Sequence, residues 1–224
     1  MTAITVHHLE NSRSTRILWM LEELELPYEL KVYPRDPATM RAPPELARLH
    51  PLGKAPVVTL GDLVLAESGA ILEHLAEAHG RLRPAPGSDA MVPYRYWLHY
   101  AEGSLMPPLL VKLIMDTVRN APLPFFVKPF AKGVAEKVDG SYTNAELERH
   151  FTYLDRALAD APYFAGEEFT AADIQMSYPV QAGMGRADAG SRPNVRAWLD
   201  RVTARPAYHR AVEKGGPVGS PKAG

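Results

Sequence analysis

The chain has 224 residues and an almost balanced charge, with 25 basic and 26 acidic side chains. Hydrophobic residues make up 46% of it and no run of roughly eighteen apolar residues occurs, which indicates a globular protein without a membrane span. The even charge argues against a nucleic-acid-binding surface, and the lack of cysteine excludes disulfides, thiolate metal sites and cysteine nucleophiles.

The N-terminal residues predict a β-α-β unit. Apolar and polar residues alternate over 4–9, which is typical of a short strand. An apolar stripe over 17–24 predicts a helix that Pro27 ends, and residues 28–33 predict a second strand. Because a helical crossover joins the two strands, they should run parallel.

A β-β-α unit follows. Residues 44–49 predict one or two helical turns, and two strands over 57–60 and 63–66 are joined by a two-residue hairpin. Ser68 is a candidate N-cap for the next helix, and Gly80 closes that helix. The resulting order of elements is that of a thioredoxin-like α/β domain, with boundaries at 1–80.

The rest of the chain predicts helices alone. Residues 81–90 are polar and rich in proline and glycine, which indicates a linker to an all-α domain over 91–224. Pro107 and Pro108 are expected to interrupt the first long helix. The expected helices lie over 92–106 with a continuation to 119, over 144–158, from 170, and over 194–205, with a last turn over 208–213 and a loose tail over 215–224.

Three short segments carry residue types suited to chemistry. The first is Ala55-Pro56-Val57, which opens a strand after a turn. A proline there can simply begin an edge strand, or a cis peptide can turn the backbone of Ala55 outward to pair with an extended peptide ligand. Lys54, just before it, could reach a ligand carboxylate or remain solvated.

The second segment is Glu67-Ser68, at the start of a predicted helix. A plain N-cap is the simpler interpretation of Ser68. A helix N-terminus also binds anions, so Ser68 could hold an α-carboxylate while Glu67 receives the neighbouring ammonium group. An acid beside a hydroxyl therefore suits one end of a zwitterionic amino acid.

The third segment holds Asn11, Ser12 and Ser14, which either cap the first helix or donate a hydrogen bond to a ligand thiolate. Lowering a thiol pKa by about 2 units needs about 2.7 kcal/mol. One hydrogen bond to a charged group contributes about 1.5–3 kcal/mol and a helix N-terminus adds roughly 0.3–1 kcal/mol. One such donor together with the helix dipole is therefore sufficient.

Two further features are easier to interpret. Thr170 and Asp173 form a capping-box pattern, which predicts a structural helix start. Trp97 and Tyr100 lie on the first long helix and either belong to the core or line an apolar pocket. The histidines show no metal-binding pattern, so we expect no bound metal.

Together these segments resemble the cytosolic glutathione transferase family over nearly the whole chain. The matching stretches are RILWMLEELELPYEL after the early serines, HPLGKAPVV, LAESGAILEHLAE, GEEFTAADI and PNVRAWLDRVTARPAY. The combination of Ala55-Pro56 with Glu67-Ser68 is the most specific part. The RILWMLEELELPYE run looks like the bacterial and fungal subgroup related to the yeast Gtt-type enzymes.

The resemblance implies a thioredoxin-like domain followed by an all-α domain, assembled as a homodimer. It implies that Glu67 and Ser68 grip the γ-glutamyl end of glutathione. It also implies that the Ala55-Pro56-Val57 segment, with a cis peptide, pairs with the cysteinyl backbone, and that Lys54 lies near the glycyl end.

The resemblance leaves three candidates for the residue that activates the thiol. Family members of the Tyr type use a tyrosine in the first strand, but no tyrosine occurs before Tyr28, and the Cys type is excluded by composition. The Ser-type pattern remains. Its serine position falls at Ser12 or at Asn11, depending on loop length, with Ser14 as a third candidate.

The leading interpretation is a transferase that stabilises the glutathione thiolate for attack on a small hydrophobic electrophile. The electrophile would lie between the domains, against Trp97 and Tyr100. The alternatives are a glutathione-dependent disulfide or peroxide reductase, and a non-catalytic glutathione-binding or regulatory protein. We expect a cytoplasmic protein, since residues 1–10 show no secretory-signal pattern.

Overall fold

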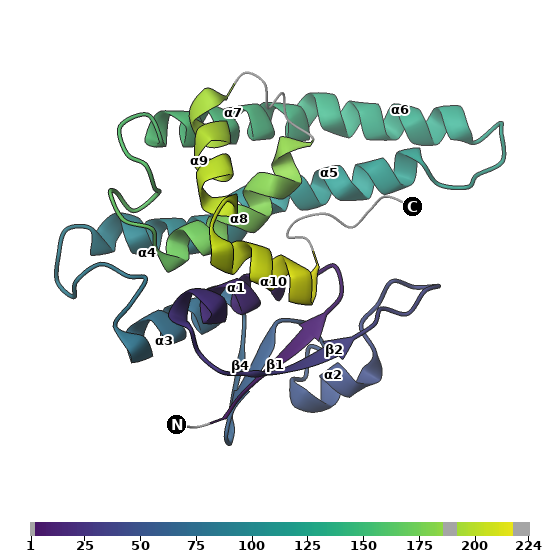
Figure 1. The fold of residues 1–224 in the computed structure, drawn as a ribbon. Helices are drawn as coiled ribbons and strands as arrows, with labels where there is room; N and C mark the ends of the chain where they lie inside the picture. Colours follow the sequence, from purple (N-terminus) through teal and green to yellow (C-terminus); the bar gives the residue numbers. More distant parts are fainter. Residues whose placement is uncertain (1–2, 186–191, 217–224) are drawn as a thin grey trace.

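The computed structural model describes residues 3–185 and 192–216, and it shows a sheet layer beneath a stack of helices (Figure 1). β1 runs parallel to β2 and antiparallel to β3, and β3 runs antiparallel to β4, in the order β2-β1-β3-β4. This mixed sheet confirms the predicted thioredoxin-like arrangement. The strands are β1 (Ile4–Leu9), β2 (Glu29–Tyr33), β3 (Val57–Leu60) and β4 (Leu63–Ala66).

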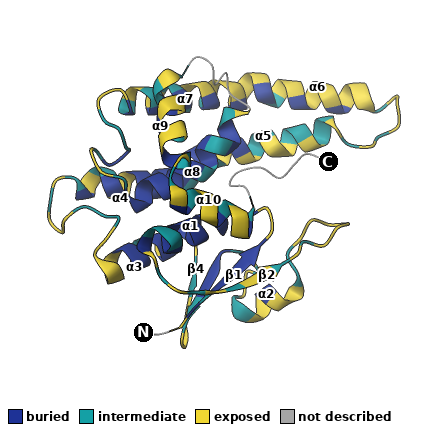
Figure 2. Ribbon diagram, viewed as in Figure 1, coloured by how far each residue is buried: buried dark blue, intermediate teal, exposed yellow. Residues whose placement is uncertain are grey.

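Three helices accompany the sheet: α1 (Thr15–Leu24), α2 (Pro44–Leu49) and α3 (Ser68–His79). Helices α1 and α3 lie between the sheet and the C-terminal helices, so α1 is buried along most of its length (Figures 1 and 2). The helix ends before Pro27 because Glu25 adopts a left-handed conformation with φ 58° and terminates it.

Within its described residues, the C-terminal layer is built from helices joined by loops. Helix α8 lies at its centre and is buried on nearly every side, while α10 packs against α1 (Figure 2). The elements are α4 (Met91–Tyr100), the π-helical segment η1 (Ala101–Leu105), α5 (Met106–Arg119), α6 (Lys128–Val138), the π-helical segment η2 (Asp139–Thr143), α7 (Asn144–Ala157), α8 (Ala171–Met184), α9 (Pro193–Thr203) and α10 (Pro206–Gly215).

One sequence-based expectation about these helices was wrong. Pro107 and Pro108 do not interrupt the helix, because they take the first turn of α5, where a missing N–H is tolerated after the wide turn of η1. The helix predicted over 144–158 is confirmed as α7, but the sequence did not predict α6 and η2, which lead into it from Lys128, with Pro129 in the first turn of α6. The tail predicted to be loose lies largely outside the described residues.

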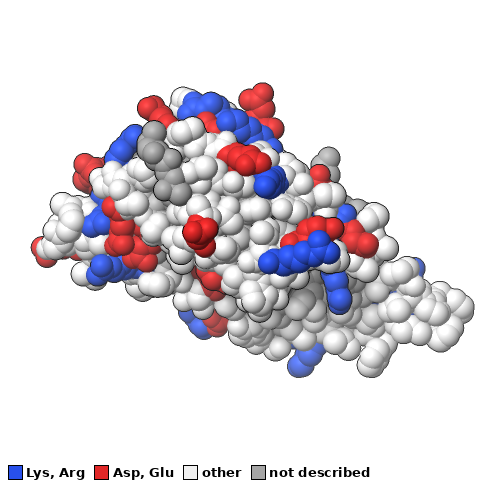
Figure 3. All heavy atoms as spheres, turned by 90° about the horizontal axis from the view of Figure 1, so that it is seen from below, with Lys and Arg blue, Asp and Glu red and all other residues white. Residues whose placement is uncertain are grey.

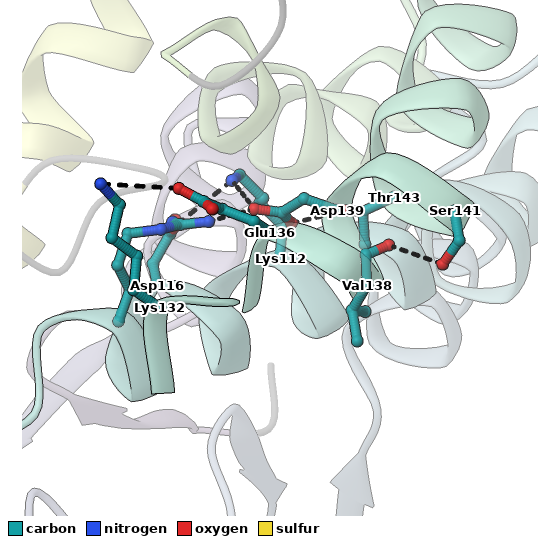
Figure 4. A network of polar contacts seen from close by, with 9 residues as sticks. Lys112, Asp116, Lys132, Glu136, Val138, Asp139, Ser141 and Thr143 are labelled. Carbon is teal, nitrogen blue, oxygen red and sulfur yellow. Dashed lines mark hydrogen bonds and ion pairs between the residues drawn. The ribbon is translucent and has the colours of Figure 1, made fainter. Parts of the chain in front are cut away.

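A buried carboxylate joins the long helices α5 and α6 (Figure 4). Asp139, 5% exposed, accepts hydrogen bonds from Lys112 Nζ at 2.7 Å, from Thr143 Oγ1 at 2.7 Å and from Arg119. Burial raises the pKa of Asp139, but these donors outweigh it and lower the pKa from 3.8 to about 2. The π-helical turn η2 thereby places a charged anchor between the two helices.

We expect Asp139→Asn to lower the free energy of unfolding by on the order of 2 kcal/mol at neutral pH. Because the folded-state pKa is depressed, the contribution is fully present above pH 3.8 and is lost as the pH falls towards 2. Urea unfolding at neutral and acidic pH measures the difference. Glu136→Gln is the matched control, since its ion pair with Lys132 is exposed; an equal loss in that variant contradicts the assignment.

The surface shows mixed charge. On the face in Figure 3, small groups of acidic and basic side chains are interspersed among uncharged ones. Within residues 3–185 and 192–216, every helix is too short or too polar to span a bilayer.

Candidate functional site

A groove runs along the edge of the sheet layer, formed by two adjoining cavities of about 220 Å³ and 550 Å³. Glu67 and Ser68 line the smaller cavity, and Asn11 and Ser12 line the larger one. The two cavities share four lining residues, Arg13, Leu52, Lys54 and Ala55. The segments singled out in the sequence therefore meet in one continuous groove.

The middle of the groove is the loop before β3. The Ala55-Pro56 peptide bond is cis, as the family resemblance implied, and both residues line the smaller cavity. Val57 differs from them: it is fully buried and is paired with Ala66 and His7 inside the sheet. The contribution of Val57 is therefore to anchor the loop.

Unusual backbone conformations cluster around the groove. Asn11, Met40 and Glu67 have φ values of 50°, 55° and 67°, a region that non-glycine residues seldom adopt, and all three line the cavities. Such conformations concentrate at functional sites, where the surrounding structure holds them in place.

Ser68 is placed differently from the N-cap that its sequence position predicts. It is the first residue of α3, Glu67 takes the cap position, and neither side chain caps the helix. The Ser68 hydroxyl instead accepts a hydrogen bond from Arg16 Nη2 at 2.8 Å. Its own hydrogen is therefore free to be donated into the cavity, at the positive end of the helix.

Arg16 is fully buried beneath Ser68 and connects three elements. It donates to Glu102 Oε1 at 2.7 Å and to the Gln175 carbonyl oxygen at 2.6 Å, in addition to Ser68. Arg13 Nε lies 3.0 and 3.1 Å from the two oxygens of Glu102. With Glu67 in the same cavity, two guanidinium groups and two carboxylates meet at this end of the groove, which therefore offers both signs of charge.

The charge state of Glu102 follows from these contacts. Burial raises the pKa of Glu102, but the positive charges of Arg16 and Arg13 together lower it by more than burial raises it. The net result is a lowered pKa. Glu102 lies on the π-helical segment η1, a type of turn that is often found at functional sites.

The early serines form a chain that leads inward. Ser12 is 7% exposed and lines the larger cavity, whereas Ser14 is fully buried. Ser12 Oγ lies 2.6 Å from Ser14 Oγ, which lies 2.7 Å from His8 Nδ1. Neither serine caps α1 through its side chain. Asn11 is exposed at the mouth of the same cavity.

Comparison with known proteins identifies the family. The model of the glutathione S-transferase N-terminal domain matches residues 1–77, and that of the C-terminal domain matches residues 114–206. Glutathione S-transferase 3 of Schizosaccharomyces pombe is 43% identical over 94% of this chain and 87% of its own length. The chain belongs to the glutathione S-transferase family.

Two further members support this assignment. Glutathione S-transferase 1 of Saccharomyces cerevisiae is 34% identical over 97% of both chains. A glutathione transferase family member from Pseudomonas fluorescens, solved with two glutathione bound, is 28% identical with a TM-score of 0.74 over 95% of this chain and 93% of its own. The resemblance to the yeast enzymes and the expected fold and enzyme class are thereby confirmed.

In this glutathione S-transferase the aromatic pair expected at a pocket lies elsewhere. Trp97 and Tyr100 are buried, pack with Tyr153 and Phe164, and line neither cavity of the groove. Tyr100 also hydrogen-bonds His150. The aromatic residue that does line the larger cavity is the half-buried Tyr178 of α8.

Sequence reasoning missed several residues at the site. One of them had a signal: Arg16 stands three and four residues before Trp19 and Met20, so the periodicity places a charge on the buried face of α1. Glu102 and Tyr178 had none, because only tertiary packing brings them to the groove. The described residues contain no group of three His, Asp or Glu side chains suited to a metal ion.

Proposed function

We propose that glutathione lies along the groove, with its γ-glutamyl end at Glu67 and Ser68 and its thiol at Ser12, and that its thiolate attacks a small hydrophobic electrophile. The observation that carries this proposal is the continuity of the two cavities past Ala55. The glutathione bound in the Pseudomonas fluorescens relative supports the choice of ligand.

The end of the groove at Ser68 suits a zwitterion. The free hydrogen of Ser68 and the N-terminus of α3 face an α-carboxylate, with Arg16 behind them. The ammonium group would be held by Glu67 and Glu102. The buried Gln175 Oε1, which lacks a hydrogen-bond partner and lines an adjoining cavity with both glutamates, offers a further acceptor.

The middle and far ends of the groove suit the rest of a tripeptide. Ala55 precedes β3 at the wall shared by both cavities, where an extended ligand backbone can pair with it. Lys54 is exposed beside it and can reach the glycyl carboxylate. Ser12 precedes α1, so a thiolate there would gain a hydroxyl donor and the positive end of the helix.

The electrophile would occupy the larger cavity. Leu9, Met40 and Tyr178 give that cavity an apolar part, which supports a hydrophobic second substrate. The rest of its lining is polar and includes four basic side chains, Arg13, Arg35, Arg41 and Lys54. This placement replaces the one against Trp97 and Tyr100.

Family membership further supports a cytoplasmic homodimer without nucleic-acid or membrane partners, and sedimentation analysis tests the dimer.

Calorimetry and a substrate panel test the proposal together. We expect glutathione to bind and an aryl halide to be conjugated faster than a hydroperoxide or a mixed disulfide is reduced. Faster reduction would favour the reductase alternative, and binding without turnover on any of the three would favour a regulatory role. Absence of binding at millimolar glutathione contradicts the proposal.

Ser68→Ala is expected to weaken glutathione binding about tenfold or more, because a hydrogen bond to a carboxylate contributes about 1.5–3 kcal/mol. Calorimetric Kd values measure the effect. Ser141→Ala removes an exposed hydroxyl far from the groove and is the matched control. Equal affinities for the two variants would remove Ser68 from the binding site.

A further inference from the structure

One buried histidine near the groove has no role in the function proposed above. His8 lies on β1 with 1% exposure, paired with Val32 of β2, and its side chain reaches Ser14, the residue before α1, and Gly215 of α10. A β-carbon on Gly215 would lie 3.0 Å from His8 Cε1 and 2.5 Å from a carbon of Leu18. Only glycine therefore allows α10 to approach the ring this closely.

The hydrogen bonds of neutral His8 fix the direction of the serine chain. The Gly215 carbonyl oxygen beside the ring raises the pKa of His8, as an acceptor for a ring N–H does. When the ring gives its one N–H to that oxygen, Nδ1 carries no hydrogen and accepts one from Ser14 Oγ at 2.7 Å. Ser14 has then used its only hydrogen, and Ser12 must donate in the 2.6 Å contact between the two hydroxyls. Ser12 consequently presents a lone pair to the cavity.

Protonation of His8 reverses the hydrogen bonds between the ring, Ser14 Oγ and Ser12 Oγ. Both ring nitrogens then donate, and Ser14 accepts from Nδ1 and donates to Ser12 at 2.6 Å, a closer acceptor than the Leu9 carbonyl oxygen at 3.4 Å. Ser12 Oγ, which also accepts from the Ser14 backbone N–H at 3.2 Å, then directs its own hydrogen into the cavity. The neutral form thus suits a thiol, which donates, and the protonated form suits a thiolate, which accepts. The two states of the chain match the two states of the ligand sulfur.

We propose that His8, acting through Ser14 and Ser12, receives the proton of the glutathione thiol. This inference rests on the proposed binding of glutathione with its sulfur at Ser12. The S–H bond breaks and an Nδ1–H bond forms, while each serine hydroxyl gives one hydrogen inward and takes one from outside. After the thiolate attacks the electrophile, the same hydroxyls return the proton outward to water or to the addition product.

The surroundings of His8 keep its ring neutral in the free protein. Burial lowers the pKa of His8, while the Gly215 carbonyl and the Glu10 carboxylate oppose that effect, and the net result is a lowered pKa. The Ser14 hydroxyl and the Gly215 carbonyl group, which interact with the ring, carry no charge. His8 is therefore neutral in the free protein at neutral pH, and a thiolate at Ser12 favours its protonation.

Nitrogen-15 NMR of the His8 ring tests the proton transfer in the intact protein. With glutathione at neutral pH, we expect the imidazolium signal to grow in step with the ultraviolet absorbance of the thiolate. With S-methylglutathione, which has no ionisable thiol, the ring should stay neutral. Ser14→Ala should keep the ring neutral in both complexes and reduce the thiolate fraction about tenfold at neutral pH.

The outcomes separate this inference from the function on which it rests. A thiolate band without an imidazolium signal overturns the role of His8 and leaves the proposed function intact. Failure of glutathione to bind overturns both. The comparison of the two ligands needs only the wild-type protein, so it decides the question even where Ser14→Ala fails to fold.

Discussion

Ser12→Ala is expected to lower kcat/KM for an aryl halide about 10- to 150-fold. The substitution removes a hydrogen bond to a developing thiolate, which contributes about 1.5–3 kcal/mol. The same loss should raise the apparent pKa of the bound thiol by about one to two units. Ultraviolet titration of the glutathione complex measures the pKa, and steady-state kinetics measure the rate.

Asn11→Gly is the matched control for Ser12. Asn11 lies at the mouth of the same cavity with φ 50°, a conformation that glycine adopts without strain, so this variant removes only the amide. We expect its kcat/KM to stay within about threefold of the wild-type value, which corresponds to a change in activation free energy of less than about 0.7 kcal/mol. A large loss for Asn11→Gly beside an unaffected Ser12→Ala would reverse the assignment.

Asp173→Ala should be the most damaging single substitution for stability, with a loss of about 3–5 kcal/mol. The capping box predicted from Thr170 and Asp173 is confirmed, and its carboxylate accepts four donors. They are the backbone N–H groups of Phe164 and Thr170 at 3.0 Å each, the Thr170 hydroxyl at 3.2 Å and Trp198 Nε1 at 2.9 Å. Removing the fully buried carboxylate leaves all four without an acceptor.

Urea unfolding followed by circular dichroism measures this loss. Thr170→Ser keeps the capping hydroxyl and should cost less than about 1 kcal/mol, which makes it the control. Asp173→Asn should fall between the two, because its amide nitrogen cannot accept from the donors that face it. An Asp173→Ala protein as stable as Thr170→Ser would show that the loop before α8 does not depend on this carboxylate.

The sheet layer was predictable from the sequence because its signals are local. Alternation over 4–9 and 57–66 and the hairpin at Gly61 gave strands that match within one residue. The long helices were less predictable. Prolines such as Pro107, Pro108 and Pro129 are expected to break helices, but here they follow an unusual turn or begin a helix, and sequence periodicity does not reveal that difference.

In the groove too, residues with a local sequence signal were predictable and residues placed by tertiary packing were not. Ser12, Ala55 and Ser68 could be selected because each sits at a turn or helix start that the sequence displays. Glu102 could not, because its approach to the sheet layer depends on the π-helical segment that shifts the helix register. Trp97 illustrates the opposite error, since an aromatic residue on a helix between two layers is equally suited to a core and to a pocket.

Arg16 links ligand binding to the packing of the sheet layer against the helical layer. One guanidinium group holds Ser68 at the groove and the Gln175 carbonyl oxygen in the centre of the helical layer. The sheet layer by itself would leave that cation exposed to water and would lack Glu102 as well. The complete peptide-binding surface therefore forms only when the sheet layer and the helical layer are packed together. A ligand that binds this surface stabilises the packed form by mass action, and so makes separation of the two layers less favourable.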